Sequence, residues 1–174
     1  MTEKVEINRS KAAVIIMDYQ IRILDFLPKE RLPGLLKRAN NVLAKARQKG
    51  IPVIYVEVLR GERTPEMEIH PDIKPKAGET VLTKHRVGPF STTNLDEILK
   101  KQGIDTLVLM GVSTSGCVLS TVRWAYDIDY QLIVLSDCCA DRDDEVQRVL
   151  MEKVFTRMTK VITSQEFIEA LEGI

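Results

Sequence analysis

Short apolar runs alternate with longer segments of helical periodicity along this chain. The run from Ala12 to Met17 is rich in β-branched residues and ends in polar ones, a pattern typical of a strand buried on both faces. Further runs of this kind predict strands at residues 51–58, 81–84, 104–112, 130–137 and 160–164. The pattern therefore indicates six strands.

Helices are predicted between most of these strands. Over residues 32–49 apolar side chains recur at helical spacing, Pro33 suits the first turn, and Gly50 with Pro52 ends the segment. Further helices are predicted at residues 95–102, 117–126, 143–155 and 164–172. The alternation predicts an α/β fold: a single doubly wound domain over residues 1–174, with a six-stranded, mostly parallel sheet and helices on both faces.

Residues 60–78 break this rhythm. The segment RGERTPEMEIHPDIKPKAG contains three prolines, two glycines and many charges. We expect a long surface loop near the functional site, because loops of this length in compact domains are often functional. A solvated excursion without a role explains the composition equally well.

Composition narrows the classes of partner. Lys and Arg number 25 and so do Asp and Glu, so no basic excess favours nucleic acid or a membrane surface. The N-terminal segment MTEKVEINRSK lacks the apolar core of a secretory signal, and no apolar run approaches the ~20 residues that span a bilayer. Three cysteines, two of them adjacent, fit neither a disulfide framework nor a zinc site. We expect a cytoplasmic protein.

Candidate chemistry appears where three predicted strands end. Asp18 directly follows the first strand, Lys84 ends the third, and Cys117 lies a few residues beyond the strand at 104–112. The carboxyl ends of parallel strands share one edge of the sheet, where ligands bind in such folds. Each residue taken alone has an ordinary explanation: Asp18 as a cap, Lys84 as a solvated side chain and Cys117 as part of the core. The hypothesis of a functional site depends on all three lying at the same edge.

These residue types suit nucleophilic catalysis by a thiol. A helix N-terminus and the Lys84 ammonium would lower the pKa of Cys117, and Asp18 could take the thiol proton and return it to a leaving amine. The turn GVSTSG leads into the predicted helix, so the backbone amides of Ser113 and Cys117 could hold an oxyanion.

Competing motifs are weaker. The glycines of GVSTSG have P-loop spacing, but Cys117 and Val118 stand where Lys and Ser or Thr are needed. Cys117 and Arg123 have phosphatase spacing, yet the intervening VLSTV has no glycine and reads as helix. Ser113 falls one glycine short of a nucleophile elbow. Cys138 or Cys139 could be a rival nucleophile, although packing beside the pocket explains them better.

The segments AAVIIMDYQ, KHRVGPFSTTNLDEIL and LVLMGVSTSGCVLSTVRWAYDIDYQLIVLSDCCADRD, with the tail MEKVFTRMTKVIT, resemble the isochorismatase-like cysteine hydrolases. That family includes nicotinamidases and N-carbamoylsarcosine amidase. The resemblance implies a catalytic triad that falls on Asp18, Lys84 and Cys117. It also implies a cis peptide bond between Val112 and Ser113, and a pocket aromatic at Phe90, for which core packing is an equal alternative.

The resemblance also bears on cofactors and substrates. The nicotinamidases' metal pattern is not matched by Glu57, His70 and Asp72, so we expect no metal and no other cofactor, and nicotinamide becomes an unfavoured substrate. Members that hydrolyse the vinyl ether of isochorismate can lack the cysteine, so Cys117 favours a small amide or carbamoyl substrate and a thioester intermediate. The residues that would select the substrate lie in the loops at 60–78 and 86–90, and no spacing rule identifies a substrate from such loops.

Two alternatives to this hydrolase remain open. One is isochorismatase-type hydrolysis of a vinyl ether, and the other is a catalytically silent member that acts as an interaction subunit. The intact set of Asp18, Lys84 and Cys117 argues against a silent scaffold, because such a scaffold has no need of a buried charged pair beside a thiol. By analogy with the family we expect a homo-oligomer, a dimer or a tetramer.

Overall fold

A computed structural model describes residues 5–173 of the chain. Their strands form one sheet in the order β3-β2-β1-β4-β5-β6, and every strand pair is parallel. The strands are β1 (Ala12–Met17), β2 (Val53–Val58), β3 (Thr80–Lys84), β4 (Thr106–Val112), β5 (Gln131–Ala140) and β6 (Lys160–Ile162). The predicted six-stranded α/β fold is confirmed, with a sheet that is entirely rather than mostly parallel. Residues 1–4 belong to the N-terminal segment that was compared with a secretory signal, and they lie outside the described part of the chain.

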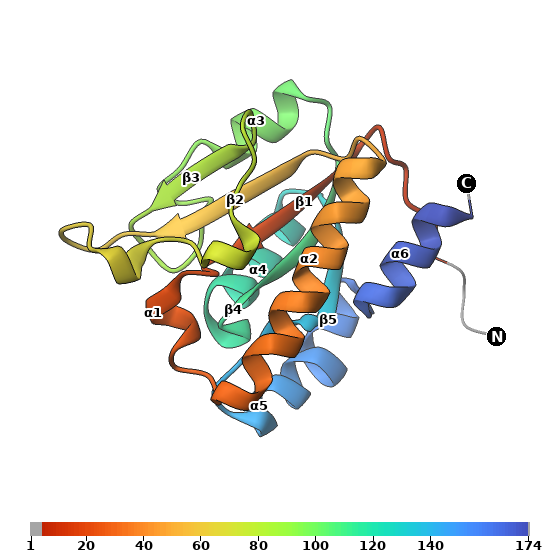
Figure 1. The fold of residues 1–174 in the computed structure, drawn as a ribbon. Helices are drawn as coiled ribbons and strands as arrows, with labels where there is room; N and C mark the ends of the chain where they lie inside the picture. The colour runs from red at the N-terminus through yellow and green to blue at the C-terminus, as the bar shows by residue number, and fades with distance from the viewer. Residues whose placement is uncertain (1–4, 174) are drawn as a thin grey trace.

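Helices cover both faces of this sheet, with α2 and α6 on one face and α3 and α4 on the other (Figure 1). The helices are α1 (Ile21–Leu24), α2 (Leu32–Gln48), α3 (Leu95–Lys101), α4 (Leu119–Asp127), α5 (Asp144–Val149) and α6 (Ser164–Glu172). On α2 the buried stripe Leu35, Leu36, Ala39, Val42, Leu43 and Ala46 is the one that the periodicity predicts. No helix among residues 5–173 is long and apolar enough to cross a bilayer.

The core explains why the central strands read as continuous apolar runs. Every residue of β1 is buried, and so are six of the seven residues of β4. Strands in the middle of a parallel sheet are covered by helices on both faces, so neither face can carry polar side chains. Polar residues are therefore displaced to the strand ends.

Three elements differ from their predicted bounds near the carboxyl edge, one of them β6, which ends at Ile162 rather than at residue 164. The helix expected to begin at Cys117 begins earlier, as a π-helical turn over Thr114–Val118 that continues into α4. The strand expected to end at residue 137 continues to Ala140, because a register shift between Leu109 and Gly111 lets β5 keep pairing with the end of β4.

The topology fixes where a ligand can bind. The strand order reverses between β1 and β4, where the chain winds outward to β2 and β3 on one side and to β5 and β6 on the other. The loops that follow the two strands separate at such a switch point and leave a crevice. Asp18 follows β1, and the turn that carries Cys117 follows β4.

Candidate active site

Asp18 and Lys84 form a buried ion pair at this edge. Lys84 is the last residue of β3, and its Nζ donates to Oδ2 of Asp18 at 2.8 Å and to the backbone carbonyl of Arg86 at 3.2 Å. The two side chains are only 1% and 7% exposed. The other carboxylate oxygen of Asp18, Oδ1, is buried and has no hydrogen-bond partner within residues 5–173. The pair thus keeps one acceptor free.

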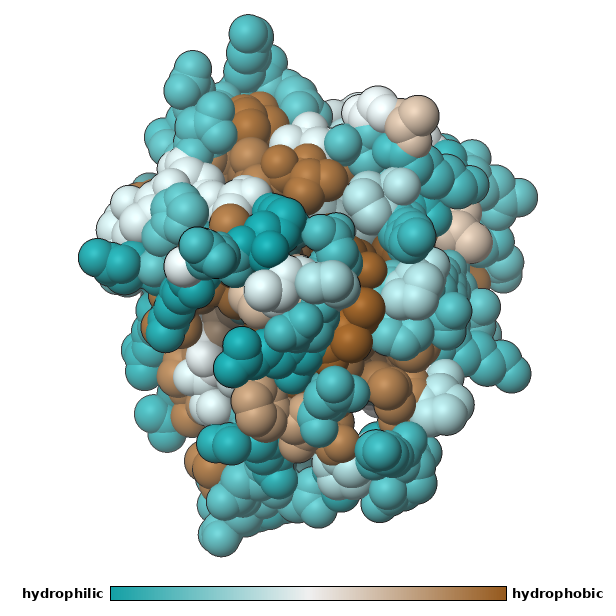
Figure 2. Space-filling view, turned by 60° about the vertical axis from the view of Figure 1, so that its left-hand side comes forward, coloured by the Kyte–Doolittle hydropathy of each residue, from teal (hydrophilic) through white to brown (hydrophobic). Residues whose placement is uncertain are grey.

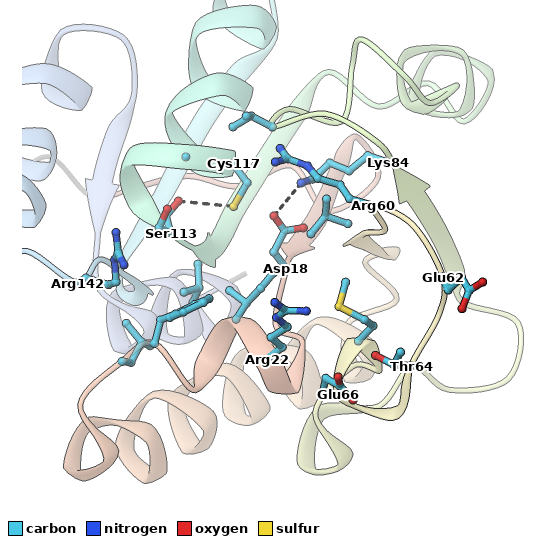
Figure 3. Close-up of a pocket in the computed structure, with 18 residues that line it drawn as sticks. Asp18, Arg22, Arg60, Glu62, Thr64, Glu66, Lys84, Ser113, Cys117 and Arg142 are labelled. Carbon is cyan, nitrogen blue, oxygen red and sulfur yellow. Dashed lines mark hydrogen bonds and ion pairs between the residues drawn. The ribbon is translucent and has the colours of Figure 1, made fainter.

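Cys117 brings its thiol to the same place. The side chain is buried in the π-helical turn and its Sγ lies on the Asp18 side of that turn (Figure 3). The thiol donates to the backbone carbonyl of Ser113 at 3.6 Å, a long contact for a weak donor. Since Oδ1 of Asp18 is unpartnered, it is available to receive the thiol proton. The structure therefore brings the three predicted side chains together.

The electrostatics correct one expectation, that the pKa of the thiol is lowered. Burial raises the pKa of Cys117 well above its ordinary value, and the neighbouring Asp18 carboxylate raises it further, although Lys84 opposes both effects. Burial also raises the pKa of Asp18 to about 6, against the opposing charge of Lys84 and its hydrogen bond. At neutral pH this cluster holds a thiol beside a carboxylate.

Two glycines make room for the turn that carries Cys117. A Cβ on Gly111 would lie 3.1 Å from Sγ of Cys117 and 3.1 Å from the carbonyl oxygen of Met17. A Cβ on Gly116 would lie 2.8 Å from Oγ of Ser113. The peptide bond between Val112 and Ser113 is cis, as the resemblance implies. A side chain at Gly111 would push the turn away from the strand, and one at Gly116 would displace the hydroxyl of Ser113.

Asp141 and Gln147 hold the turn from the side of β5. Oδ2 of Asp141 accepts the backbone N–H of Ser115 at 2.8 Å, which satisfies one of the orphan amides of the first turn. The hydroxyl of Thr114 donates to Oε1 of Gln147, whose Nε2 donates to the carbonyl of Cys139 at 3.2 Å. These bonds link the turn to the end of β5.

A cavity of about 650 Å³ opens over these groups. Its apolar lining is contributed by Ile23, Phe26, Leu27, Val58, Met67, Val87 and Val112. Its polar lining includes the three predicted side chains, Ser113, the arginines Arg22, Arg60 and Arg142, and Glu62, Thr64 and Glu66 from the loop at 60–78. Figure 2 brings the left-hand side of Figure 1 forward and shows hydrophobic residues exposed among hydrophilic ones on that face. The loop therefore lines the candidate site.

Phe90 does not line this cavity, which corrects the expectation of a pocket aromatic there. Its ring stacks on Trp124, with centroids 6.4 Å apart and planes inclined by 6°, and it also contacts Tyr130. Phe90 is half-buried and packs against the hydrophobic core, which is the alternative role that the sequence left open for it.

Cys138 and Cys139 are free and buried, and neither lines the cavity. Burial raises the pKa of Cys139 to about 12 and that of Cys138 further. Both thiols lie within β5. Their placement fits packing beside the site.

The residues weighed as metal ligands have other partners. Glu57 accepts hydrogen bonds from Arg63 and, at 2.7 Å, from the hydroxyl of Thr83. Nδ1 of His70 accepts the backbone N–H of Asp72 at 3.2 Å. Over the described part of the chain no three His, Cys, Asp or Glu side chains are grouped to hold a metal ion. The expected lack of a metal or other cofactor stays a prediction.

Sequence reasoning missed several residues of the site. Asp141 follows the end of β5 just as Asp18 follows β1, so the same strand-end rule could have found it. Arg22 and Arg142 offered no comparable signal, because an isolated arginine in a loop or a short helix is ordinarily solvated. Only the fold brings them to one cavity.

Comparisons with known proteins point to one family. The family model described as the isochorismatase domain matches residues 12–166. An uncharacterized isochorismatase family protein of Bacillus subtilis, YwoC, is 36% identical over 105 residues, which are 60% of this chain and 56% of that protein. Maleamate amidohydrolase of Pseudomonas putida is 33% identical over 102 residues, which are 59% of this chain and 48% of that enzyme. The matched regions span about half the length of these two relatives.

The fold is shared over a longer stretch. The structure of an isochorismatase family protein from Burkholderia thailandensis superimposes with a TM-score of 0.87 at 26% identity. The superposition covers 96% of this chain and 98% of that one.

Proposed function

This chain belongs to the isochorismatase family, and we propose that it is a cysteine-dependent hydrolase of a small amide or carbamoyl compound. The observation that carries the proposal is the unpartnered Oδ1 of Asp18 beside the buried thiol of Cys117, in a cavity with apolar walls. Acyl transfer through a thiol requires a base beside the nucleophile. The relationship to maleamate amidohydrolase supports amide chemistry.

The proposed reaction begins with proton transfer from the thiol. Oδ1 of Asp18 accepts the proton as Sγ of Cys117 attacks the carbonyl carbon, and Lys84 stabilises the charges on both groups. The resulting oxyanion is held by the backbone amides of Ser113 and Cys117. The C–N bond then breaks, Asp18 returns the proton to the departing amine, and a thioester remains.

Water completes the turnover. Asp18 accepts a proton from the attacking water, the thioester opens, and the proton returns to Sγ as the carboxylic acid leaves. The sum is one amide and one water converted to one acid and one amine. Because the thiol starts protonated, the base must act in the attacking step, which makes Asp18 as necessary as Cys117.

Release of ammonia or acid from a panel of small amides and carbamoyl compounds, and of acid from isochorismate, tests the proposal. We expect Cys117→Ala to lower kcat by at least ~10³-fold, because the nucleophile and its base act as one unit. Cys139→Ala is the matched control, since that thiol is also buried at this edge but lies outside the cavity, and it should keep most of the activity. Undiminished turnover by Cys117→Ala would overturn the proposal, and turnover of isochorismate alone would favour vinyl ether hydrolysis.

A further inference from the structure

A strap of chain, residues 59–67, forms one wall of the cavity over Cys117. The strap residues that line the cavity are Arg60, Glu62, Thr64, Glu66 and Met67. Alternate residues from 60 to 66 therefore face the cavity. Thr64 and Glu66 lie across it from Ser113, which precedes the nucleophile turn (Figure 3). A ligand bound over Cys117 would meet the strap on this side.

The strap has little backbone bonding of its own. Among residues 5–173, no backbone N–H of residues 60–64 donates to another backbone group. Arg63 pairs with the carboxylate of Glu57, but the arginine side chain is 41% exposed, and an ion pair that is open to water contributes little. The position of the strap is therefore set largely at its two ends.

One buried side chain binds both ends. Gln20 is 1% exposed, and its Nε2 donates to the carbonyl oxygen of Val58 at 2.9 Å and to that of Met67 at 2.6 Å. Its Oε1 accepts the N–H of Val58 at 2.8 Å. The amide thus joins the residue before the strap to the last residue of the strap.

The backbone of Gln20 is fixed independently of these bonds. Gln20 pairs with Ile69 in an antiparallel bridge, and the N–H of Ile21 donates to the carbonyl of Glu68 at 3.0 Å. The carbonyl of Gln20 accepts the N–H of Leu24 at 2.9 Å, at the end of α1. Gln20 does not itself line the cavity. Its side chain is therefore a fixed clamp beside the site and makes no contact with a ligand.

We propose that Gln20 is a positioning residue, which holds the strap as the wall of the cavity opposite the nucleophile turn and thereby sets the affinity for the substrate. The hydrogen bonds of the Asp18, Lys84 and Cys117 side chains do not involve the amide of Gln20. Without the clamp the strap is correctly placed for only part of the time, and the apparent affinity falls by that fraction. The effect on affinity rests on the proposed function, whereas the effect on the strap does not.

Hydrogen exchange tests the clamp without any substrate. The backbone amides of Leu59 and Met67 donate to the carbonyls of Lys84 and Thr64 and report on the two ends of the strap. Gln20→Met keeps the length of the side chain but has no amide. We expect it to speed exchange of both amides about tenfold or more, because exchange follows local opening, while amides in β1 and β4 keep the wild-type rate.

Asn40→Leu is the matched control. Nδ2 of Asn40 donates to the carbonyl of Asp72 at 2.8 Å, so it is also a side-chain amide bound to the loop at 60–78, but outside the strap. This variant should leave exchange at Leu59 and Met67 unchanged.

Steady-state kinetics tests the consequence, with the best substrate from the panel of small amides and carbamoyl compounds. Gln20→Met should raise KM about tenfold while kcat stays within about threefold of the wild-type value. The pH dependence of kcat should not change, because Asp18 keeps its partner Lys84. Gln20→Glu should give intermediate values, since burial keeps its carboxyl group neutral, with one donor and with an acceptor for Val58.

Three results would overturn the inference: wild-type exchange at Leu59 and Met67 in Gln20→Met, a lower kcat at unchanged KM, or the same changes in Asn40→Leu. If Gln20→Met does not fold, Gln20→Glu carries the same test with smaller expected changes.

Failure of the inference can be told apart from failure of the proposed function. If exchange rises only in the Gln20 variants but the wild-type protein hydrolyses no amide, the clamp stands and the reaction is wrong. If the wild-type protein hydrolyses amides but Gln20→Met matches it in exchange and in KM, the reaction stands and the clamp is wrong.

Discussion

At the scale of single residues, the fold gives Asp18 an uncommon backbone conformation and changes the pKa of its carboxyl group. Its backbone has φ of 58°, in the left-handed region that aspartate tolerates better than most residues. Its carboxylate is buried beside Lys84, and burial raises its pKa to about 6. A carboxylate with that pKa is ionised at neutral pH and is still basic enough to take a proton.

The pKa of Asp18 predicts the acid limb of the pH profile. Only the ionised carboxylate can accept the thiol proton, so kcat/KM should rise with pH and level off above an apparent pKa near 6. Asp18→Asn should lower kcat/KM by about 10²- to 10⁴-fold and abolish this limb. Asp105→Asn, which alters a surface carboxylate paired with Lys11, should leave the profile unchanged. An identical acid limb in Asp18→Asn would assign it to another group.

At the scale of elements, the π-helical turn Thr114–Val118 is held mainly by its neighbours. Ser113 precedes the turn but offers it no side-chain cap, and the cap comes instead from Asp141 after β5. Gln147 of α5 adds a second link through Thr114. Three segments that are distant in sequence therefore determine where the amides and the thiol of this turn lie.

This arrangement predicts that Asp141 is a positioning residue. Asp141→Ala should lower kcat about tenfold or more with a smaller change in KM, because the amides and thiol of the turn lose their alignment. Asp141→Asn keeps an acceptor oxygen and should restore much of kcat. Kinetics and thermal unfolding would be measured together for each variant.

Asp143→Ala is the matched control for Asp141. Asp143 caps α5 by accepting the amides of Glu145 and Val146, a contribution of about 1 kcal/mol to stability, but it makes no bond to the nucleophile turn. Its loss should lower Tm while kcat stays near the wild-type value. Equal losses of kcat in Asp141→Ala and Asp143→Ala would reduce the role of Asp141 to stability.

At the scale of the whole molecule, burial of the ionised Asp18 carboxylate opposes stability, although the charge of Lys84 offsets part of this effect. Because burial raises the pKa of Asp18 above its value of 3.8, the folded state binds more protons than the unfolded state between pH 3.8 and about 6. The contribution of this carboxyl group to stability is therefore present at low pH and lost as pH rises through about 6. Such a loss of stability is expected for a buried charge that serves the proposed reaction.

Replacing both Asp18 and Lys84 tests whether their buried charges lower the stability of the protein. The double variant Asp18→Asn with Lys84→Met should be inactive but at least as stable as the wild type at pH 7, because it removes two buried charges together. Lys84→Met alone leaves an uncompensated buried carboxyl group and should be the less stable variant. Urea unfolding at pH 7 and pH 5 measures both effects, and a double variant less stable than Lys84→Met would contradict the expectation.

Some properties of the whole molecule stay predictions. The homo-oligomer rests on the resemblance, and the cytoplasmic location rests on the number and spacing of the cysteines.

The sequence by itself determined the order and type of the main elements and placed Asp18, Lys84 and Cys117 at one edge. It could do so because strands buried on both faces must be apolar, so their polar ends stand out, and because parallel strands end on the same side. Helix α2 could also be predicted from the sequence, since its buried residues recur at helical spacing.

Only the tertiary structure decided the environment of those residues. Desolvation by the surrounding core raises the pKa of Cys117, which a rule based on helix N-termini and nearby ammonium groups could not foresee. The pairing of β5 with the end of β4 sets Asp141 against the nucleophile turn, and the stacking of Phe90 on Trp124 takes that ring out of the cavity. The arginines meet there through contacts between distant segments, because burial and charge depend on every element packed around a site.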